Sequence, residues 1–155
     1  MNPNRSMPNA KLTPSLTYPD MVAAIGWLTQ VFGFREVWRI ENHGALLQFE
    51  GTEVFVREPR LVGTAKAGAA EPVAAAAGAA CLGSMLWRLE GDPPDLDRYF
   101  ETVVGRGAQV LQQPVDEVYG ERQFVVADIG GHHWTFSTTI KDLAPEDWGA
   151  TISFK

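Results

Sequence analysis

The most informative segment of the chain reads Tyr119-Gly120-Glu121-Arg122-Gln123-Phe124-Val125-Val126-Ala127-Asp128-Ile129-Gly130-Gly131-His132-His133-Trp134-Thr135-Phe136. Its aromatic and β-branched residues predict strands at 124–127 and 133–138. After the first strand, the four residues from Asp128 to Gly131 have the composition of a tight turn. We expect the Asp128 carboxylate to hold this turn by accepting hydrogen bonds from backbone amides. The segment therefore predicts a loop followed by a β-hairpin.

The first half of the chain has a regular order of elements. Asp20 is placed to cap a helix, because the apolar residues after it recur at helical spacing. Gly33 is placed to end that helix. The predicted elements are a strand at 12–18, a helix at 20–32, and strands at 34–40, 45–50 and 52–57. This half reads β-α-β-β-β.

The second half repeats the pattern. Asp95 is interpreted as the cap of a second helix, which ends at Gly105 and Gly107. The predicted elements are a strand at 80–89, a helix from 95, a strand at 109–111, a loop at 112–120 carrying Pro114, and the hairpin strands. A repeated supersecondary unit is stronger evidence for a fold than any single element.

These elements predict one α+β domain at 12–140, made of module one at 12–58 and module two at 80–140. Residues 59–79 are rich in Ala and Gly and are interpreted as a connector, although alanine also favours helix. The remaining segments are an N-terminal tail at 1–11 and a C-terminal tail at 141–155. The C-terminal tail contains Trp148 and is expected to pack on the domain or a partner, or to stay loose.

Composition excludes several classes of protein. The net charge of -6 and the lack of a Lys/Arg cluster argue against nucleic-acid binding. No run of apolar residues is long enough for a membrane span. A single cysteine, Cys81, rules out an internal disulfide, and no base is evident that would make it a nucleophile. The start of the chain lacks the apolar core of a signal peptide, so we expect a cytoplasmic protein.

The two halves together resemble the vicinal oxygen chelate superfamily, which includes glyoxalase I, bleomycin-resistance proteins and extradiol dioxygenases. The resemblance rests on Val31-Phe32-Gly33-Phe34 after the first helix and on the closing hairpin from Tyr119 to Phe136. It implies curved mixed sheets from two β-α-β-β-β modules around a shared cleft, often completed in a homodimer. It also implies a small-molecule ligand and, in the enzymes, a divalent metal.

The superfamily's enzymes take metal ligands, usually His, Gln or Glu, from the first and last strand of each module. The matching positions here are Thr13, Val56 or Arg57, one of residues 84–87, and Thr135. None is His, Gln or Glu, and arginine would repel a cation. The resemblance therefore predicts a chain without a catalytic metal or other cofactor.

The three histidines do not obviously replace those ligands. His43 lies in a predicted turn, whereas His132 and His133 are adjacent and would face opposite sides of a strand. We expect His132 to take part in the hydrogen bonding of its turn.

Five residues are candidates for ligand binding. Trp38 and Trp87 each lie in the first or second strand of a module, and each either stacks on a planar ligand or packs in the core. The resemblance places Tyr119 and Arg122 in a loop beside the cleft, where a guanidinium can hold an anionic or carbonyl-bearing ligand. Arg57 fills the position of a lost metal ligand if its register puts it on the cleft side.

Arg122 has an alternative role, which is a salt bridge with Asp128 or another turn carboxylate. No convincing acid-base pair is evident among the carboxylates of the chain, so the catalytic residues are unknown. The sequence favours a metal-free protein that binds an antibiotic or metabolite in a dimeric cleft. A metal-dependent lyase or dioxygenase with displaced ligands, and an interaction protein without a ligand, stay open as alternatives.

Overall fold

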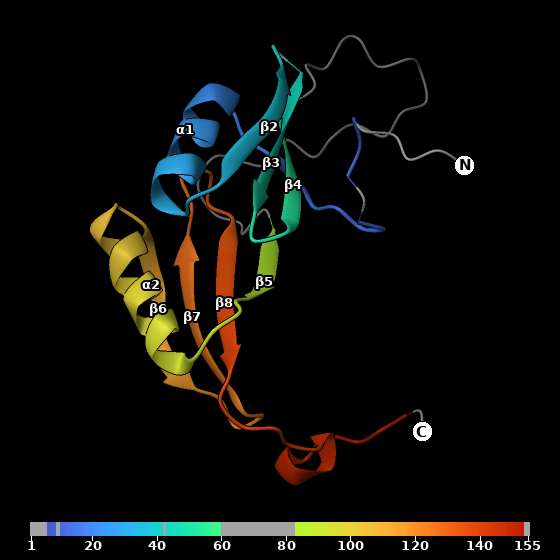
Figure 1. Cartoon of the computed structure of the whole chain (residues 1–155), viewed down its shortest axis with the longest axis vertical. Coiled ribbons are helices and arrows are strands. Elements are labelled where there is room, and N and C mark those ends of the chain that lie inside the picture. The colour runs from blue at the N-terminus through green and yellow to red at the C-terminus, as the bar shows by residue number, and fades with distance from the viewer. Residues whose placement is uncertain (1–5, 9, 42, 60–82, 154–155) are drawn as a thin grey trace. The chain divides into compact units, whose positions relative to one another are not determined.

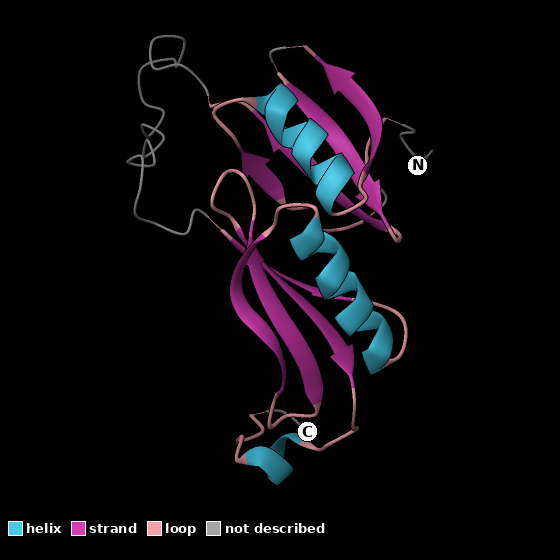
Figure 2. Ribbon diagram, turned by 90° about the vertical axis from the view of Figure 1, so that its left-hand side faces the viewer, coloured by secondary structure: helices cyan, strands magenta, loops and turns pink. Residues whose placement is uncertain are grey.

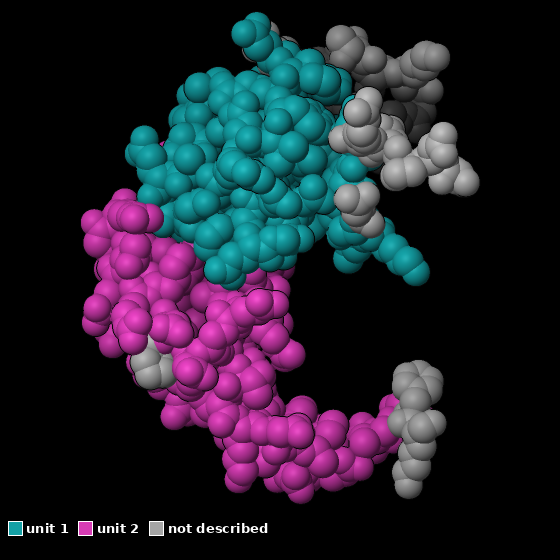
Figure 3. All heavy atoms as spheres, in the orientation of Figure 1, with its two compact units in different colours: residues 1–80 teal, residues 81–155 magenta. Residues whose placement is uncertain are grey.

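A computed structural model describes residues 6–8, 10–41, 43–59 and 83–153 of the chain. The chain divides into two compact units, Met1–Ala80 and Cys81–Lys155, which Figure 3 shows in different colours. Each unit contains a four-stranded sheet and one α-helix in the order β-α-β-β-β. Figure 1 labels most of these elements along the chain. Apart from residue 59, the predicted connector lies outside the described residues.

Unit 1 contains a sheet with the strand order β1-β4-β3-β2. Its elements are β1 (Ser15–Thr17), α1 (Met21–Val31), β2 (Arg35–Ile40), β3 (Gly44–Phe49) and β4 (Thr52–Arg57). Strands β1 and β4 pair in parallel, and the other two pairs are antiparallel. The predicted cap is confirmed, because the Asp20 side chain accepts a hydrogen bond from the backbone N–H of Ala23 at 2.9 Å.

Unit 2 contains a second sheet with the equivalent order β5-β8-β7-β6. Its elements are β5 (Ser84–Arg88), α2 (Pro93–Gly105), β6 (Gln109–Asp116), β7 (Glu121–Ala127), β8 (His133–Thr139) and the 3₁₀ helix η1 (Pro145–Trp148). Strands β5 and β8 are parallel, so the pairing pattern of unit 1 is repeated. Figure 2 shows α1 and α2 lying across their respective sheets.

The start of α2 differs from the prediction. The helix begins at Pro93, its cap is Asp92, and Asp95 lies in its first turn. The Asp95 carboxylate accepts a hydrogen bond from the Asp92 backbone N–H at 3.4 Å. The prediction of Asp95 as the cap was wrong because proline suits the first helical position, where an N–H is not needed.

Strand β6 is also longer than predicted, since it runs to Asp116 and includes Pro114. It lies at the edge of the sheet, and its pairing with β7 shifts register between Val110 and Gln112 and again between Gln112 and Val115. Proline is tolerated in an edge strand because it lacks an N–H, and an edge strand needs N–H donors for a neighbouring strand on one side only. The predicted loop at 112–120 therefore begins only after Asp116.

Each sheet has one face covered by its helix, here called the covered face, and an opposite open face. On the covered face of unit 1 the buried sheet residues are aliphatic: Leu16, Ala45, Leu47, Val54 and Val56. On the covered face of unit 2 they are mainly aromatic: Trp87, Phe124, Val126, Trp134 and Phe136. Tyr99 of α2 packs edge-on against Phe136, with ring centroids 5.1 Å apart.

The hairpin turn between β7 and β8 has the predicted internal support. The Asp128 carboxylate accepts hydrogen bonds from the backbone N–H groups of Gly130 at 2.8 Å and His132 at 3.0 Å. It also accepts one from the Trp134 indole at 2.9 Å, which fixes the largest fully buried side chain of the core. Among the helices described, none combines the length and apolar character needed to cross a membrane.

Candidate functional site

The open face of unit 2 carries a connected network of polar side chains on β7 and β8. The Ser137 hydroxyl donates to Glu121 Oε2 at 2.5 Å and accepts from Gln123 Nε2 at 3.1 Å. Gln123 Oε1 accepts from the Tyr119 hydroxyl at 2.9 Å. Alternation along the strands produces this face, because the neighbouring residues Phe124 and Phe136 point into the core.

Glu121 is the charged centre of the network. Its side chain is 12% exposed, and its Oε1 accepts from Thr139 Oγ1 at 2.7 Å and contacts Arg88 at 3.4 Å. Burial acts to raise the pKa of Glu121, but the Ser137 and Thr139 hydroxyls and the Arg88 charge outweigh it, so the pKa is lowered. A negative charge is therefore held at this position at neutral pH.

Tyr119 lies in the connection between β6 and β7, at the edge of the network. Burial raises its pKa, and the charges of Glu117 and Glu121 raise it further, while the hydrogen bond to Gln123 acts in the opposite direction. Tyr119 therefore stays protonated and serves as a donor. Its ring also packs edge-on against Trp148, with centroids 5.8 Å apart.

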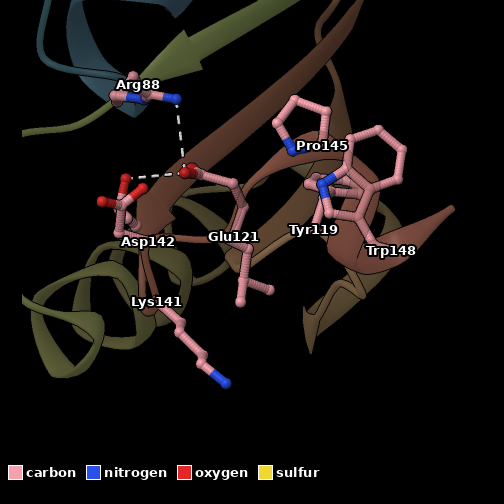
Figure 4. A pocket seen from close by; sticks show the side chains of 9 residues that line it. Arg88, Tyr119, Glu121, Lys141, Asp142, Pro145 and Trp148 are labelled. Carbon is pink, nitrogen blue, oxygen red and sulfur yellow. Dashed lines mark hydrogen bonds and ion pairs between the residues drawn. The ribbon is translucent and has the colours of Figure 1, made fainter. Parts of the chain in front are cut away.

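A pocket of about 510 Å³ opens beside this network. The sheet side of the pocket is formed by Arg88, Tyr119, Glu121 and Thr139. The other side comes from the C-terminal segment, defined here as residues 140–150, through Lys141, Asp142, Leu143, Pro145 and Trp148. Figure 4 shows the Pro145, Tyr119 and Trp148 rings together on one side and the Arg88–Glu121 pair on the other.

The C-terminal segment is attached to the sheet by its backbone. The Gly120 carbonyl accepts hydrogen bonds from the N–H groups of Ile140 at 2.9 Å and Lys141 at 3.1 Å. Gly120 has a φ of +84°, and a Cβ on it would collide with the Lys141 carbonyl oxygen. Only glycine permits this close approach. Together with the Tyr119–Trp148 contact, the bonds give the segment a defined path.

Arg122 is placed on the covered face and not beside the pocket. Its guanidinium binds both carboxylate oxygens of Asp97 on α2, at 2.9 and 3.2 Å, and Asp116 on β6 at 2.5 Å. These two hydrogen-bonded carboxylates raise its pKa. Arg122 therefore forms the salt bridge that was the alternative to ligand binding, but its partners are Asp97 and Asp116 and not Asp128. A contact of Arg122 with a ligand stays a prediction.

The two candidate tryptophans lie on different faces of their sheets. Trp87 is 6% exposed on the covered face of unit 2, with its ring 6.2 Å from that of Trp134. The core-packing interpretation describes its position. Trp38 is half-buried, its ring lies 5.8 Å from Phe55, and its indole N–H donates to the Ser6 carbonyl at 3.0 Å.

Arg57 lies on the open face of unit 1, since it alternates with the buried Val54 and Val56 of β4. Its guanidinium lies 5.2 Å from the centre of the Phe55 ring, in a cation–π arrangement. The register thus places Arg57 on the same face as Phe55. Of the five predicted site residues, Trp38 and Arg57 both contact Phe55, and Tyr119 alone lines the pocket.

Two consecutive β-α-β-β-β units, each with a mixed four-stranded sheet and one helix, define an α+β protein with a glyoxalase/bleomycin-resistance-like fold. The chain belongs to the Glyoxalase/Bleomycin resistance protein/Dioxygenase superfamily, whose sequence model matches residues 12–136. This match spans most of both units and confirms the resemblance predicted from the sequence.

Individual proteins are similar to this chain in sequence or in structure. TioX from Micromonospora sp. ML1 is 29% identical, with a TM-score of 0.63 over 84% of this chain and 99% of that chain. A lactoylglutathione lyase from Agrobacterium tumefaciens is 18% identical, with a TM-score of 0.64 over 84% and 94% of the two chains, and shares the fold. The uncharacterized protein Rv0887c of Mycobacterium tuberculosis is 25% identical over 149 residues, covering 92% of this chain and 82% of that protein.

The strand positions that match the superfamily's metal ligands do not fit a divalent metal. Thr135 on β8 is flanked on the open face by Leu86 and Val125, whose aliphatic side chains have no atom that could coordinate a metal. In unit 1, Val56 is fully buried on the covered face, and Arg57 brings a positive charge. Within the described ranges, His, Cys, Asp and Glu residues form no group of three that can hold a metal ion.

Sequence reasoning missed most of the polar network and the pocket. Gln123 on β7 and Ser137 on β8 lie next to the buried Phe124 and Phe136, which is a signal for the opposite face. The polar residues Arg122 and Thr138 interrupt the alternation on the way to Glu121 and Thr139. The cross-strand pairing of Gln123 with Ser137 depends on the register, which the sequence did not give. The folding back of the C-terminal segment depends on Gly120, a glycine in a turn that suggested no particular contact.

Proposed function

We propose that this protein binds a small organic molecule on the open face of unit 2, without a catalytic metal. The observation that carries the proposal is the pairing of an ordered polar network with a pocket on that face. The network presents an ionised carboxylate, amide and hydroxyl groups, and the pocket adds aromatic walls. Concave sites with apolar walls and a few fixed polar groups are typical of small-molecule binding.

The absence of a metal in this proposal rests on the chemistry of the residues. Thr135 offers a neutral hydroxyl between two aliphatic neighbours, and Glu121 is already bound by two hydroxyl donors and Arg88. Neither arrangement offers the several free oxygen or nitrogen donors that a divalent metal requires. Membership of the superfamily supports a small-molecule ligand, and by the same analogy we propose a homodimer in the cytoplasm.

A thermal-shift screen in the presence of a metal chelator tests the proposal. The protein is purified without a histidine tag, and the screen covers glycopeptide antibiotics, thiol adducts and catechols. A ligand bound only by the folded state stabilises it by about 2.7 kcal/mol at 100 times its dissociation constant. We expect at least one class to raise the melting temperature in a concentration-dependent manner with the chelator present.

Two results would contradict the proposal. The first is stoichiometric nickel, zinc, iron or manganese in the purified protein, lost together with ligand binding on chelation. The second is a screen in which no compound raises the melting temperature, with or without added metal.

A further inference from the structure

The pocket of unit 2 combines aromatic rings with carboxylates. Tyr119 and Trp148 contact each other edge to face, and Pro145 lies beside them in Figure 4. Glu121 and Asp142 also line the pocket. Aromatic faces attract cations through the ring quadrupole, and carboxylates attract them through charge. The aromatic wall and the carboxylates therefore both favour a positively charged ligand.

The positive residues of the pocket do not reverse this preference. Arg88 contacts Glu121 at 3.4 Å, and its side chain is 67% exposed. The Lys141 ammonium points away from Glu121 and Arg88 in Figure 4. Across the described part of the chain, the Asp142 carboxylate forms no ion pair. An incoming cation thus meets one carboxylate that has no ion-pair partner and a second that is held ionised.

The aromatic wall depends on the C-terminal segment. Trp148 is 40% exposed, so its ring is partly covered by Tyr119 and partly free to contact a ligand. The backbone bonds from Ile140 and Lys141 to Gly120 direct the segment past the network, and η1 then brings Trp148 onto Tyr119. Half-exposed aromatic rings held in place are typical of ligand contacts, because little side-chain entropy is lost on binding.

We infer that this pocket binds an organic cation, a positively charged nitrogen on an apolar or aromatic body, with the C-terminal segment as one of its walls. The inference rests on the proposed function and specifies the ligand class and the site. The cationic nitrogen contacts Asp142 and the Glu121 side of the pocket. The apolar body contacts Trp148, Tyr119 and Pro145.

Titration with benzyltrimethylammonium tests the inference. The indole N–H resonances of the five tryptophans are followed by ¹H–¹⁵N NMR, and the Trp148→Phe variant assigns the Trp148 signal. We expect the Trp148 signal to shift in a saturable manner. Affinity should exceed that for neutral benzyl alcohol and anionic phenylacetate by about tenfold, which lies between the effects of an exposed and a desolvated cation–π contact, and it should fall as salt is added.

Substitutions of exposed residues test the charged and the aromatic wall separately. Asp142→Asn should weaken binding about fivefold, as expected for one exposed ionic contact. Trp148→Ala should weaken it about tenfold, which is measured by calorimetry because the reporter is lost. Glu101→Gln is the matched control for charge. Glu101 is an exposed residue of α2 outside the pocket lining, so its variant should bind as the unaltered protein does.

Three outcomes would overturn the inference: equal affinity for the cation and its neutral partner, a loss in Glu101→Gln equal to that in Asp142→Asn, or no response of Trp148. The proposed function would survive these results if the thermal-shift screen gave a neutral or anionic ligand that binds the open face of unit 2. It would fail together with the inference if the screen gave no ligand at all, or if ligand binding depended on a metal.

Discussion

The two units share one order of elements but use it differently. Unit 1 builds the covered face of its sheet from aliphatic residues. Its buried aromatic rings come from the residues that flank α1, namely Tyr18, Phe32 and Phe34. Unit 2 puts aromatic rings on the sheet itself and a polar network on the open face. In unit 2 the C-terminal segment also forms one side of a pocket. The repeat therefore fixes the scaffold, and the site comes from side chains that the repeat does not share.

The largest expected effect tests whether the aromatic core of unit 2 holds its hairpin. Trp134→Ala removes a fully buried ring and should lower the free energy of unfolding by about 3–5 kcal/mol, measured by urea denaturation. Trp134→Phe keeps most of the volume but loses the hydrogen bond to Asp128, so it should cost less. Equal costs for the two variants would show that the hydrogen bond, not the packing, dominates.

The second effect tests the attachment of the C-terminal segment. Gly120→Ala introduces a Cβ that collides with the Lys141 carbonyl, whereas Gly131→Ala meets no atom within 4 Å. Both glycines have a positive φ, +84° and +85°, so both variants should lose about 1–2 kcal/mol from backbone strain. Gly120→Ala should lose more, and it alone should change the Trp148 indole resonance. An unchanged Trp148 signal would contradict the path described for the segment.

The third effect concerns Arg122, which links α2 to β6 in unit 2. Arg122→Lys should destabilise the protein by about 1–3 kcal/mol, because lysine cannot reproduce the fork that binds Asp97. Arg98→Lys is the control, since Arg98 forms an exposed pair with Asp95 and should cost less than about 0.5 kcal/mol. If Arg122→Lys retained full stability but lost ligand affinity, Arg122 would be a binding residue instead.

The smallest effect is a pH dependence that belongs to Glu121. Its pKa is lowered in the folded state, so its contribution to stability is complete above the ordinary glutamate pKa of about 4.3. The contribution is lost as the pH falls through the lower pKa of the folded protein. Glu121→Gln lacks this carboxylate, so its deficit in melting temperature should stay constant from about pH 7 to about pH 5 and shrink as the pH falls below about 4. A deficit that does not shrink on acidification would contradict an ionised Glu121.

The sequence was sufficient to predict features that depend on contacts between residues close in the chain. The Asp20 cap and the Asp128 turn follow from short-range hydrogen bonding, and β4 has the predicted bounds. The sequence was insufficient where the structure depends on how distant strands pair. Pro114 suggested a loop, but an edge strand accommodates it. The network of Glu121 and Ser137 required the register of β7 and β8, which no local pattern specifies.

The most direct test of metal-free binding is the dissociation constant of the strongest ligand from the screen, measured by calorimetry on untagged protein before and after chelation. The proposed site is formed by Glu121, its hydroxyl donors and the aromatic wall, none of which involves a metal. We therefore expect the same dissociation constant in both states. A loss of binding after chelation that is restored by adding one equivalent of a divalent metal would contradict the account.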